Sequence, residues 1–156
     1  MSLSDELQAS YNPQVAQVLA ERSAISPFGT LLGVQVVEQR AGKLICKLAI
    51  EDRHMNGVGL VHGGVLTGLI DHVLSLAVYP HVEIGKWVAT LDMKVSYIAP
   101  ARNGELIAEA EVVSLRRRIG TVRIDVRNVP ASGGAPELIA AAMGTVYVRD
   151  APGKAT

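Results

Sequence analysis

The chain has 156 residues and equal numbers of basic and acidic side chains, 15 Lys and Arg against 15 Asp and Glu. This length fits one domain, and 49% hydrophobic against 19% charged residues allow a packed core, which excludes global disorder. A protein that binds nucleic acid by neutralising phosphates normally has an excess of basic residues, so the charge balance argues against a nucleic-acid partner. The single cysteine, Cys46, excludes an internal disulfide.

Neither a membrane span nor a secretory signal is expected. The longest apolar stretch, residues 58–82, is interrupted by polar side chains, namely His62, Thr67, Asp71, His72 and Ser75. A span needs about 20 predominantly apolar residues, so this stretch does not suit a membrane. Residues 1–10 lack a basic region followed by an apolar one. We therefore expect a cytoplasmic protein without a membrane partner.

A helical segment is expected over residues 4–24. Apolar residues recur there at helical spacing, and Ser4 and Asp5 can cap the first turn. Proline disrupts a helix interior, so Asn12-Pro13 is expected to divide the segment into two pieces. The run Ser26-Pro27-Phe28-Gly29 is expected as a turn between elements. We assign the chain to an N-terminal helical segment, one main domain and a tail, with the boundaries 1–25, 26–150 and 151–156.

Six strands and one long helix are expected in the main domain. Alternation of apolar and polar residues predicts strands at 32–37, 43–51, 88–98, 105–112, 122–126 and 138–148. Residues 63–79 are mostly apolar, too long for one strand and rich in Leu and Ala, which predicts a helix ended by Pro80. Asn103-Gly104 predicts a hairpin turn after the third strand. A helix that is apolar on nearly all sides must be covered, so the expected fold is α+β, with an antiparallel sheet wrapped around a central helix.

Asp71 is anomalous because it lies in the middle of this apolar helix, where an unpaired carboxylate would cost several kcal/mol. On a helical wheel, the small or polar residues within about 60° of it are Gly64, Thr67, Gly68 and Ser75. Two interpretations stay open. Asp71 is either a structural residue bonded to Thr67, Ser75 or a neighbouring strand, or a catalytic carboxylate in a dry groove.

His62-Gly63-Gly64 opens the same helix. Two glycines leave the first N–H groups unscreened, and a helix N-terminus attracts the negative charge that develops on a reacting carbonyl. The alternative is an ordinary glycine-rich helix start, with His62 as a cap or packing residue. The spacing of the four histidines matches no zinc motif, so no metal is expected. The run Arg116–Arg118 lies at a hairpin, where it is either a solvated turn or a phosphate-binding site.

Taken together, the pattern Asn56-x-x-Gly59-x-x-His62-Gly63-Gly64, followed by Asp71, resembles the active-site segment of hotdog-fold acyl-CoA thioesterases. The chain is most similar to the phenylacetate-pathway (PaaI-like) group of the 4-hydroxybenzoyl-CoA thioesterase superfamily. Further matching segments are Pro27-Phe28, Thr90–Met93 and Gly144–Tyr147, so the resemblance spans residues 24–149. It implies the hotdog fold, hydrolysis of an aryl- or short- to medium-chain acyl-CoA, and no cofactor besides the CoA of the substrate.

The resemblance also implies roles for single residues. Asp71 corresponds to the catalytic carboxylate, as nucleophile or general base, and the N–H of Gly63 to the group that polarises the thioester carbonyl. Asn56 corresponds to a residue that orients the carbonyl or the water. The residues expected to contact or position the substrate or the attacking water are His62, Gly64, Ser75, Thr90, Arg116, Arg117 and Arg118.

Helix geometry adds an expectation about assembly. Gly63 and Asp71 are eight residues apart, which is about 12 Å along one helix. Reacting atoms must lie about 3–3.5 Å apart, so one thioester would need Gly63 from one subunit and Asp71 from another. We therefore expect a homodimer with two shared sites, as the resemblance also implies, and assembly of two such dimers into a homotetramer.

Two other classes of function stay open. The first is a hotdog enoyl-CoA hydratase or dehydratase, which needs a histidine acting with a carboxylate. His72 adjoins Asp71 but points about 100° away on a helix. The second is a non-catalytic acyl-CoA-binding protein.

Overall fold

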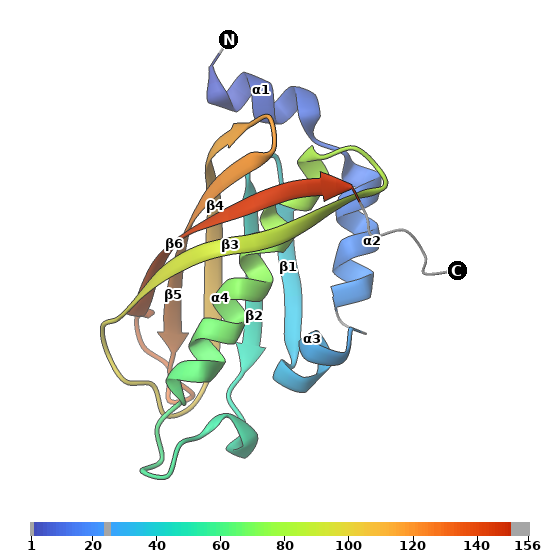
Figure 1. Ribbon diagram of the computed structural model, residues 1–156. Helices are drawn as coiled ribbons and strands as arrows, with labels where there is room; N and C mark the ends of the chain where they lie inside the picture. Colours follow the sequence, from blue (N-terminus) through green and yellow to red (C-terminus); the bar gives the residue numbers. More distant parts are fainter. Residues whose placement is uncertain (1, 24–25, 151–156) are drawn as a thin grey trace.

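A long helix enclosed by a curved antiparallel sheet forms the centre of the molecule (Figure 1). The computed structural model describes residues 2–23 and 26–150. The expected tail, residues 151–156, lies outside the described residues. The elements in chain order are α1 (Leu3–Ser10), α2 (Pro13–Ser23), α3 (Pro27–Leu32), β1 (Val34–Arg40), β2 (Lys43–Ala49), η1 (Asp52–His54), α4 (Gly63–Val78), η2 (Tyr79–His81), β3 (Lys86–Tyr97), β4 (Glu105–Arg116), β5 (Ile119–Val129) and β6 (Glu137–Asp150).

The N-terminal segment forms two helices, which confirms the predicted break at Asn12-Pro13. Helix α1 starts earlier than expected, because Ser2 is its cap. The Oγ of Ser2 accepts from the N–H of Asp5 at 3.2 Å, and the Asp5 carboxylate accepts from the N–H of Ser2 at 3.0 Å. This reciprocal pair satisfies two N–H groups at the helix start.

The turn predicted at residues 26–29 is wrong, because a short helix, α3, begins there. The Oγ of Ser26 accepts from the N–H of Gly29 at 3.1 Å. Pro27 occupies the first helical position, where its fixed φ suits a helix and its missing N–H costs nothing. Gly33 ends the helix in the left-handed region, at φ 75°.

The six strands form one antiparallel sheet in the order β1-β2-β4-β5-β6-β3. All six strands were predicted, but the hairpin predicted at Asn103-Gly104 is wrong, since β3 pairs with β6 and β4 pairs with β2. The connection between β3 and β4 instead crosses to the loop before α4, where the carbonyl of Ala101 accepts from the N–H of Val61 at 2.9 Å. Gly104, at φ 88°, turns the chain into β4 so closely that a Cβ would lie 2.0 Å from the carbonyl oxygen of Val129.

Helix α4 fills the concave side of the sheet and contacts five of its strands, β2 to β6. Its fully buried side chains are Leu69, Ile70, Val73, Leu74 and Val78. The sheet lies close to α4 at Gly144 on β6, where a Cβ would lie 2.7 Å from the Leu74 side chain. Truncating such a leucine to alanine typically costs about 2–5 kcal/mol of stability. This packing holds the site on α4 at a fixed position against β3 and β6.

The stretch Gly63–His81 is long and apolar enough to cross a membrane by length and composition alone. Half of it, however, is buried inside the fold. Its composition is therefore that of a core helix covered by a sheet.

A bulge in β3 sets the direction of Thr90. The register with β6 shifts between Thr90 and Asp92, so Leu91 is the extra residue, and it is 57% exposed. Thr90 lies opposite Val146, which is fully buried. The strict alternation predicted for residues 88–98 therefore breaks at Leu91, and Thr90 faces α4 together with the core.

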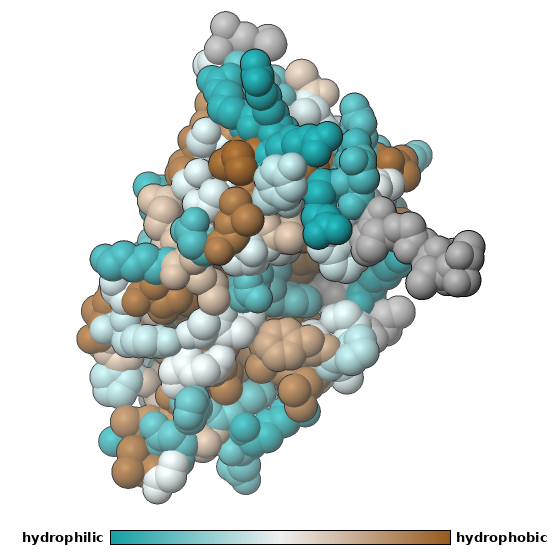
Figure 2. Space-filling model, viewed as in Figure 1, coloured by the Kyte–Doolittle hydropathy of each residue, from teal (hydrophilic) through white to brown (hydrophobic). Residues whose placement is uncertain are grey.

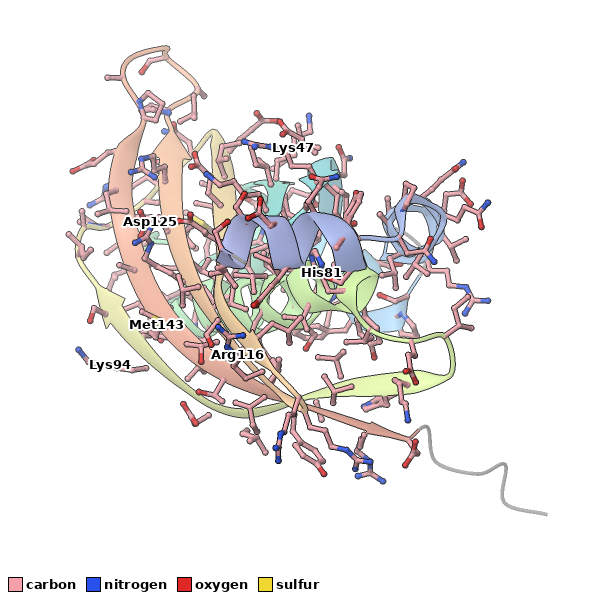
Figure 3. The ribbon with its side chains drawn as sticks, turned by 90° about the horizontal axis from the view of Figure 1, so that it is seen from above. Lys47, His81, Lys94, Arg116, Asp125 and Met143 are labelled. Carbon is pink, nitrogen blue, oxygen red and sulfur yellow. The ribbon has the colours of Figure 1, made fainter. Side chains whose placement is uncertain are left out.

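The convex face of the sheet is turned to solvent, as is common for an antiparallel sheet with one covered face. Lys94 and Met143 project from this side, away from α4 (Figure 3). Figure 2 shows apolar side chains between polar ones on the face that it presents. The large apolar side chains exposed on the edge strand β3 are Trp87, Leu91 and Tyr97.

Candidate active site

The start of α4 leaves one N–H group free. The Nδ1 of His62 accepts from the N–H of Gly64 at 2.8 Å, which confirms His62 as the helix cap. The carbonyl of His62 accepts from the N–H groups of Val65 and Leu66, at 2.9 and 3.5 Å. Within the described residues, the N–H of Gly63 has no acceptor. It lies at the positive end of the helix dipole, so it can donate to a developing oxyanion.

Asn56 holds the loop in front of this helix start. Its Oδ1 accepts from the N–H groups of Val58 and Leu60, both at 3.0 Å. Because both partners are N–H donors, the amide atom that they contact is the oxygen. The other end of the side chain is therefore the NH₂ group. That Nδ2 has no acceptor within the part of the chain that the structure describes. Asn56 therefore has a structural role through Oδ1 and keeps two donors for a ligand.

Gly63 and Asn56 line the same groove, which has a volume of about 300 Å³. Buried apolar side chains from the loop and from α4, Val61 and Leu66, also line it. Asp71 does not belong to this groove. The free donors of the site thus open into an apolar space at one end of α4.

Asp71 is half-buried in the middle of α4, and its partner comes from β3. The Oγ1 of Thr90 donates to its Oδ1 at 2.6 Å, which is a short, charge-assisted hydrogen bond. Within the described residues the carboxylate forms no ion pair. Asp71 can therefore accept a proton or attack a carbonyl without first breaking a salt bridge.

The other polar residues of the helix stripe do not bind Asp71. Thr67 bonds to Tyr97 on β3 instead, with 2.5 Å between the two hydroxyl oxygens. Ser75 is half-buried and has no hydrogen bond to Asp71. Of the structural partners considered from the sequence, only the neighbouring strand is found, through Thr90.

His72 follows Asp71 in the chain but packs on another side of the helix. Its ring centre lies 6.4 Å from that of Phe28 on α3. Gly68 makes room for this contact, since a Cβ there would lie 2.9 Å from the Phe28 ring. Burial lowers the pKa of His72, and the nearby Asp71 offsets this only in part. His72 is therefore a neutral packing residue at neutral pH.

The two halves of the expected site lie apart within one chain. Asn56 and Gly63 are at the N-terminal end of α4, and Asp71 and Thr90 lie further along it. Eight residues of helix separate Gly63 from Asp71, or about 12 Å. One chain does not bring these halves to one thioester.

The three arginines of the β4–β5 hairpin have different surroundings. Arg116, which Figure 3 labels, donates to both carboxylate oxygens of Glu6 on α1, at 3.1 and 2.9 Å. Arg118 donates to the hydroxyl of Tyr147 at 3.2 Å. Arg117, at φ 52°, and Arg118 line a cavity of about 380 Å³ with Lys86. The arrangement therefore separates Arg116 from the other two.

A further buried histidine, His81, joins three elements away from the site. The N–H of Gly42 donates to its Nε2 at 3.0 Å, and its Nδ1 lies 3.0 Å from the Oγ of Ser10 (Figure 3). Because Nε2 is an acceptor, a neutral ring has its proton on Nδ1. Burial lowers the pKa of His81. The ring thus links α1 to the β1–β2 turn in its uncharged form.

Tyr97 is a site residue that sequence reasoning missed. The sequence placed it only within the strand predicted at residues 88–98, but it lines the groove with Asn56 and Gly63. Its position depends on how the end of β3 packs against the first turns of α4. No local sequence signal contains that information.

Within the described residues, no group of three or more His, Cys, Asp or Glu side chains is arranged to hold a metal ion. Polar groups suited to a carbonyl substrate are present instead. They are backbone and side-chain N–H donors at one end of α4 and a carboxylate further along it.

Comparison with known proteins places this arrangement in a family. The model of the Thioesterase superfamily matches residues 58–133. A proposed esterase from Archaeoglobus fulgidus is 32% identical over 118 residues, which are 75% of this chain and 71% of that protein. Acyl-coenzyme A thioesterase 13 of Homo sapiens is 27% identical over 121 residues, 76% of this chain and 86% of that protein. A solved structure from Ralstonia eutropha, described as a proposed thioesterase and a phenylacetic acid degradation-related protein, has a TM-score of 0.73 at 25% identity, covering 85% of this chain and 98% of that one.

The fold and the site define a thioester hydrolase with the hotdog architecture. The chain belongs to the thioesterase superfamily. The family and the fold expected from the motif around Asn56, Gly63 and Asp71 are thereby confirmed.

Proposed function

We propose that the protein hydrolyses acyl-CoA thioesters to a free acid and CoA, at a site shared by two copies of the chain. The proposal rests on two polar groups of α4 that keep hydrogen-bonding capacity for a substrate. The N–H of Gly63 lacks an acceptor within the described residues, and the Asp71 carboxylate is bound only by Thr90. The similarity to an acyl-coenzyme A thioesterase supports CoA as the thiol of the substrate.

The chemistry follows from these donors and acceptors. The N–H of Gly63 and the amide of Asn56 donate to the thioester carbonyl oxygen and stabilise the charge that develops there. In one route, Asp71 takes a proton from a water molecule whose oxygen attacks the carbonyl carbon. In the other, Asp71 attacks directly, and water then hydrolyses the mixed anhydride. In both routes the carbon–sulfur bond breaks, and the thiolate leaves and takes up a proton.

Thr90 has a defined part in either route. Its Oγ1 donates to Oδ1 of Asp71 at 2.6 Å and so directs the second carboxylate oxygen toward the reacting centre. His62 holds the first turn of α4 through Gly64, so it positions the N–H of Gly63. We propose no direct contact of Ser75 with the reacting atoms.

A second copy supplies the missing half of each site. Strand β3 is an edge of the sheet, so its outer backbone groups are open for pairing. It also exposes apolar side chains, Trp87 at 49% and Leu91 at 57%. Strand β3 contacts Asp71 through Thr90 and contacts Gly63 through Tyr97. A copy that pairs antiparallel along this edge, centred between Thr90 and Tyr97, would therefore bring its own Gly63 toward the Asp71 of its partner. We propose a homodimer of this kind, with a tetramer as a further assembly.

Arg117 and Arg118, which line one cavity, are our candidates for binding the CoA phosphates. Arginine suits phosphate because its planar group donates several hydrogen bonds at once. We do not assign this role to Arg116, because its guanidinium is already bonded to Glu6.

Release of free thiol from a series of acyl-CoAs tests the proposal. The series should contain acetyl-, hexanoyl-, benzoyl- and phenylacetyl-CoA, with a chromogenic thiol reagent as the readout. Asp71→Asn should remain folded and lose nearly all turnover, because the amide keeps the shape but neither attacks nor takes up a proton. The matched control is Asp125→Asn, the same change on the outer face of the inner strand β5, which should leave the rates unchanged.

Three results would reject the proposal. The first is wild-type turnover in a folded Asp71→Asn variant. The second is loss of enoyl absorbance from crotonyl-CoA without release of thiol, which would identify a hydratase. Binding of acyl-CoA with no turnover of any member of the series would identify a non-catalytic binding protein.

A further inference from the structure

The groove beside the first turn of α4 has an uncharged lining. Its lining includes Asn56 and Gly63, Tyr97 and Pro100 from the end of β3 and the segment after it, and the buried side chains of Val61 and Leu66. None of the residues that line it is Asp, Glu, Lys, Arg or His. Charged phosphates therefore do not suit this groove, whereas an apolar, uncharged group does.

Tyr97 is held in this groove at both ends of its side chain. Its ring packs against the backbone of Gly63, where a Cβ would lie 3.4 Å from two ring carbons. Its hydroxyl lies 2.5 Å from the Oγ1 of Thr67 and donates to the carbonyl of Gly63 at 3.4 Å. The ring is thus fixed next to the residue whose N–H is free.

The fixed position of Tyr97 is hard to explain by folding alone. The side chain is 57% exposed, so it removes little apolar surface from water, although two hydrogen bonds restrict it. An aromatic ring that is fixed but exposed in the single chain provides a surface for a ligand. In the proposed dimer this ring lies on the paired edge β3, so the ligand that it meets is one bound at the shared site. Its neighbours Asn56 and Gly63 are the proposed carbonyl donors, so such a ligand would lie directly beside the thioester.

We propose that Tyr97 determines substrate specificity, as the wall of a groove that takes the uncharged segment attached to the thioester carbonyl. The inference rests on the proposed thioesterase function and adds to it the chemistry of the segment bound. Two parts of an acyl-CoA have this chemistry, the acyl group and the pantetheine arm. The hydroxyl has a second effect, because it positions Gly63 through Thr67 and through the Gly63 carbonyl.

Binding of non-hydrolysable substrate analogues tests this inference without depending on turnover. The probes are thioether ketones, in which a CH₂ group separates the carbonyl from sulfur. One series keeps CoA and varies the acyl part from acetyl to hexanoyl to phenylacetyl. The other keeps hexanoyl and varies the thiol from N-acetylcysteamine to pantetheine. Dissociation constants are measured by calorimetry for the wild type, Tyr97→Phe and Tyr97→Ala, with thermal unfolding to confirm that each variant is folded.

Tyr97→Ala should change the ratio of affinities within one series by about tenfold or more, since a single pocket contact discriminates to that degree. A change within the acyl series assigns the groove to the acyl group, and a change only between the two thiols assigns it to pantetheine. Tyr97→Phe keeps the ring, so it should keep both ratios while lowering kcat a few-fold. The matched control is Met143→Ala, an exposed side chain on the outer face of β6 (Figure 3), which should behave as the wild type.

Unchanged ratios in Tyr97→Ala for both series would overturn the inference. A change of ratio that is equally large in Tyr97→Phe would also overturn it, because the hydroxyl and not the wall would then be responsible. If the ratios change as expected but the wild type hydrolyses no thioester, the groove assignment stands and the proposed function fails.

Discussion

Replacing Thr90 by Val exchanges the side-chain hydroxyl for a methyl group and changes little else. Valine has nearly the shape of threonine and suits a strand, so β3 and its bulge should be preserved. What is lost is the hydrogen bond of 2.6 Å from Oγ1 to Oδ1 of Asp71. A carboxylate then remains half-buried with no protein donor among the described residues.

The size of the effect follows from the strength of this bond. A hydrogen bond to a charged group contributes about 1.5–3 kcal/mol. Both residues are half-buried, so water replaces part of the bond and the lower half of this range applies. If this energy is lost in the transition state, kcat should fall roughly 10- to 40-fold, at about 1.4 kcal/mol per factor of ten.

Steady-state thiol release from the best acyl-CoA of the series measures this effect. Thr90→Ser is the matched control, because it keeps the hydroxyl and should stay within about threefold of the wild type. Wild-type kcat in Thr90→Val would refute the role of the hydrogen bond. Equal damage in the serine and valine variants would show that the methyl group matters and not the donor.

Three further predictions concern other parts of the molecule. Asn56→Asp keeps the oxygen that accepts from Val58 and Leu60 but removes the free NH₂ donors. The loop should therefore persist while kcat/KM falls on the order of 10- to 1000-fold. An undiminished rate would leave Asn56 with only its structural role. Burial lowers the pKa of His81 below its ordinary 6.5, so below that pH the unfolded chain binds more protons than the folded one. The free energy of unfolding, from denaturant titrations, should therefore fall as the pH drops below about 6.5, and His81→Gln should reduce this fall; an identical pH dependence in the variant would contradict the assignment. Arg118→Ala should raise KM for acyl-CoAs but not for the N-acetylcysteamine thioester, which lacks the CoA phosphates. Arg116→Ala should leave KM unchanged and reduce stability by at most about 1 kcal/mol, because it loses an exposed ion pair. The opposite pattern would exchange their roles.

The helix, the strands and the candidate residues could be predicted because each has a local signal. The apolar run of residues 63–79 matches α4 within one residue at its end, since its length and composition exclude a strand. Asp71 stood out because an isolated carboxylate in an apolar helix needs an explanation. His62 as the helix cap is likewise a local feature.

The errors concern features that depend on contacts between distant segments. Asn103-Gly104 has the composition of a hairpin turn, but the pairing of β3 with β6 is decided by the whole sheet. The bulge at Leu91 turns Thr90 toward α4, and no period in the sequence contains it. Tyr97 is a site residue only because the end of β3 lies against Gly63. The bond of Arg116 to Glu6 on α1 likewise joins distant segments, so the sequence alone does not distinguish Arg116 from its two neighbours.

The shared site is the central claim, and complementation between two inactive variants tests it most directly. The first variant is Asp71→Asn, and the second is Gly63→Pro, which removes the free N–H. Proline is tolerated at the first helical position, and the preceding residue, His62, is already extended at ψ 135°, as proline requires. A Cβ at Gly63 would only touch the Tyr97 ring, at 3.4 Å.

Equal amounts of the two variants are mixed, subunit exchange is shown by native mass spectrometry, and thiol release is measured. With random exchange about half of the dimers are mixed, and each mixed dimer has one intact site and one site with both lesions, so about a quarter of the wild-type activity should return. If Gly63 and Asp71 of the same chain acted together, every site would keep a lesion. No recovery of activity after demonstrated exchange would contradict the shared site.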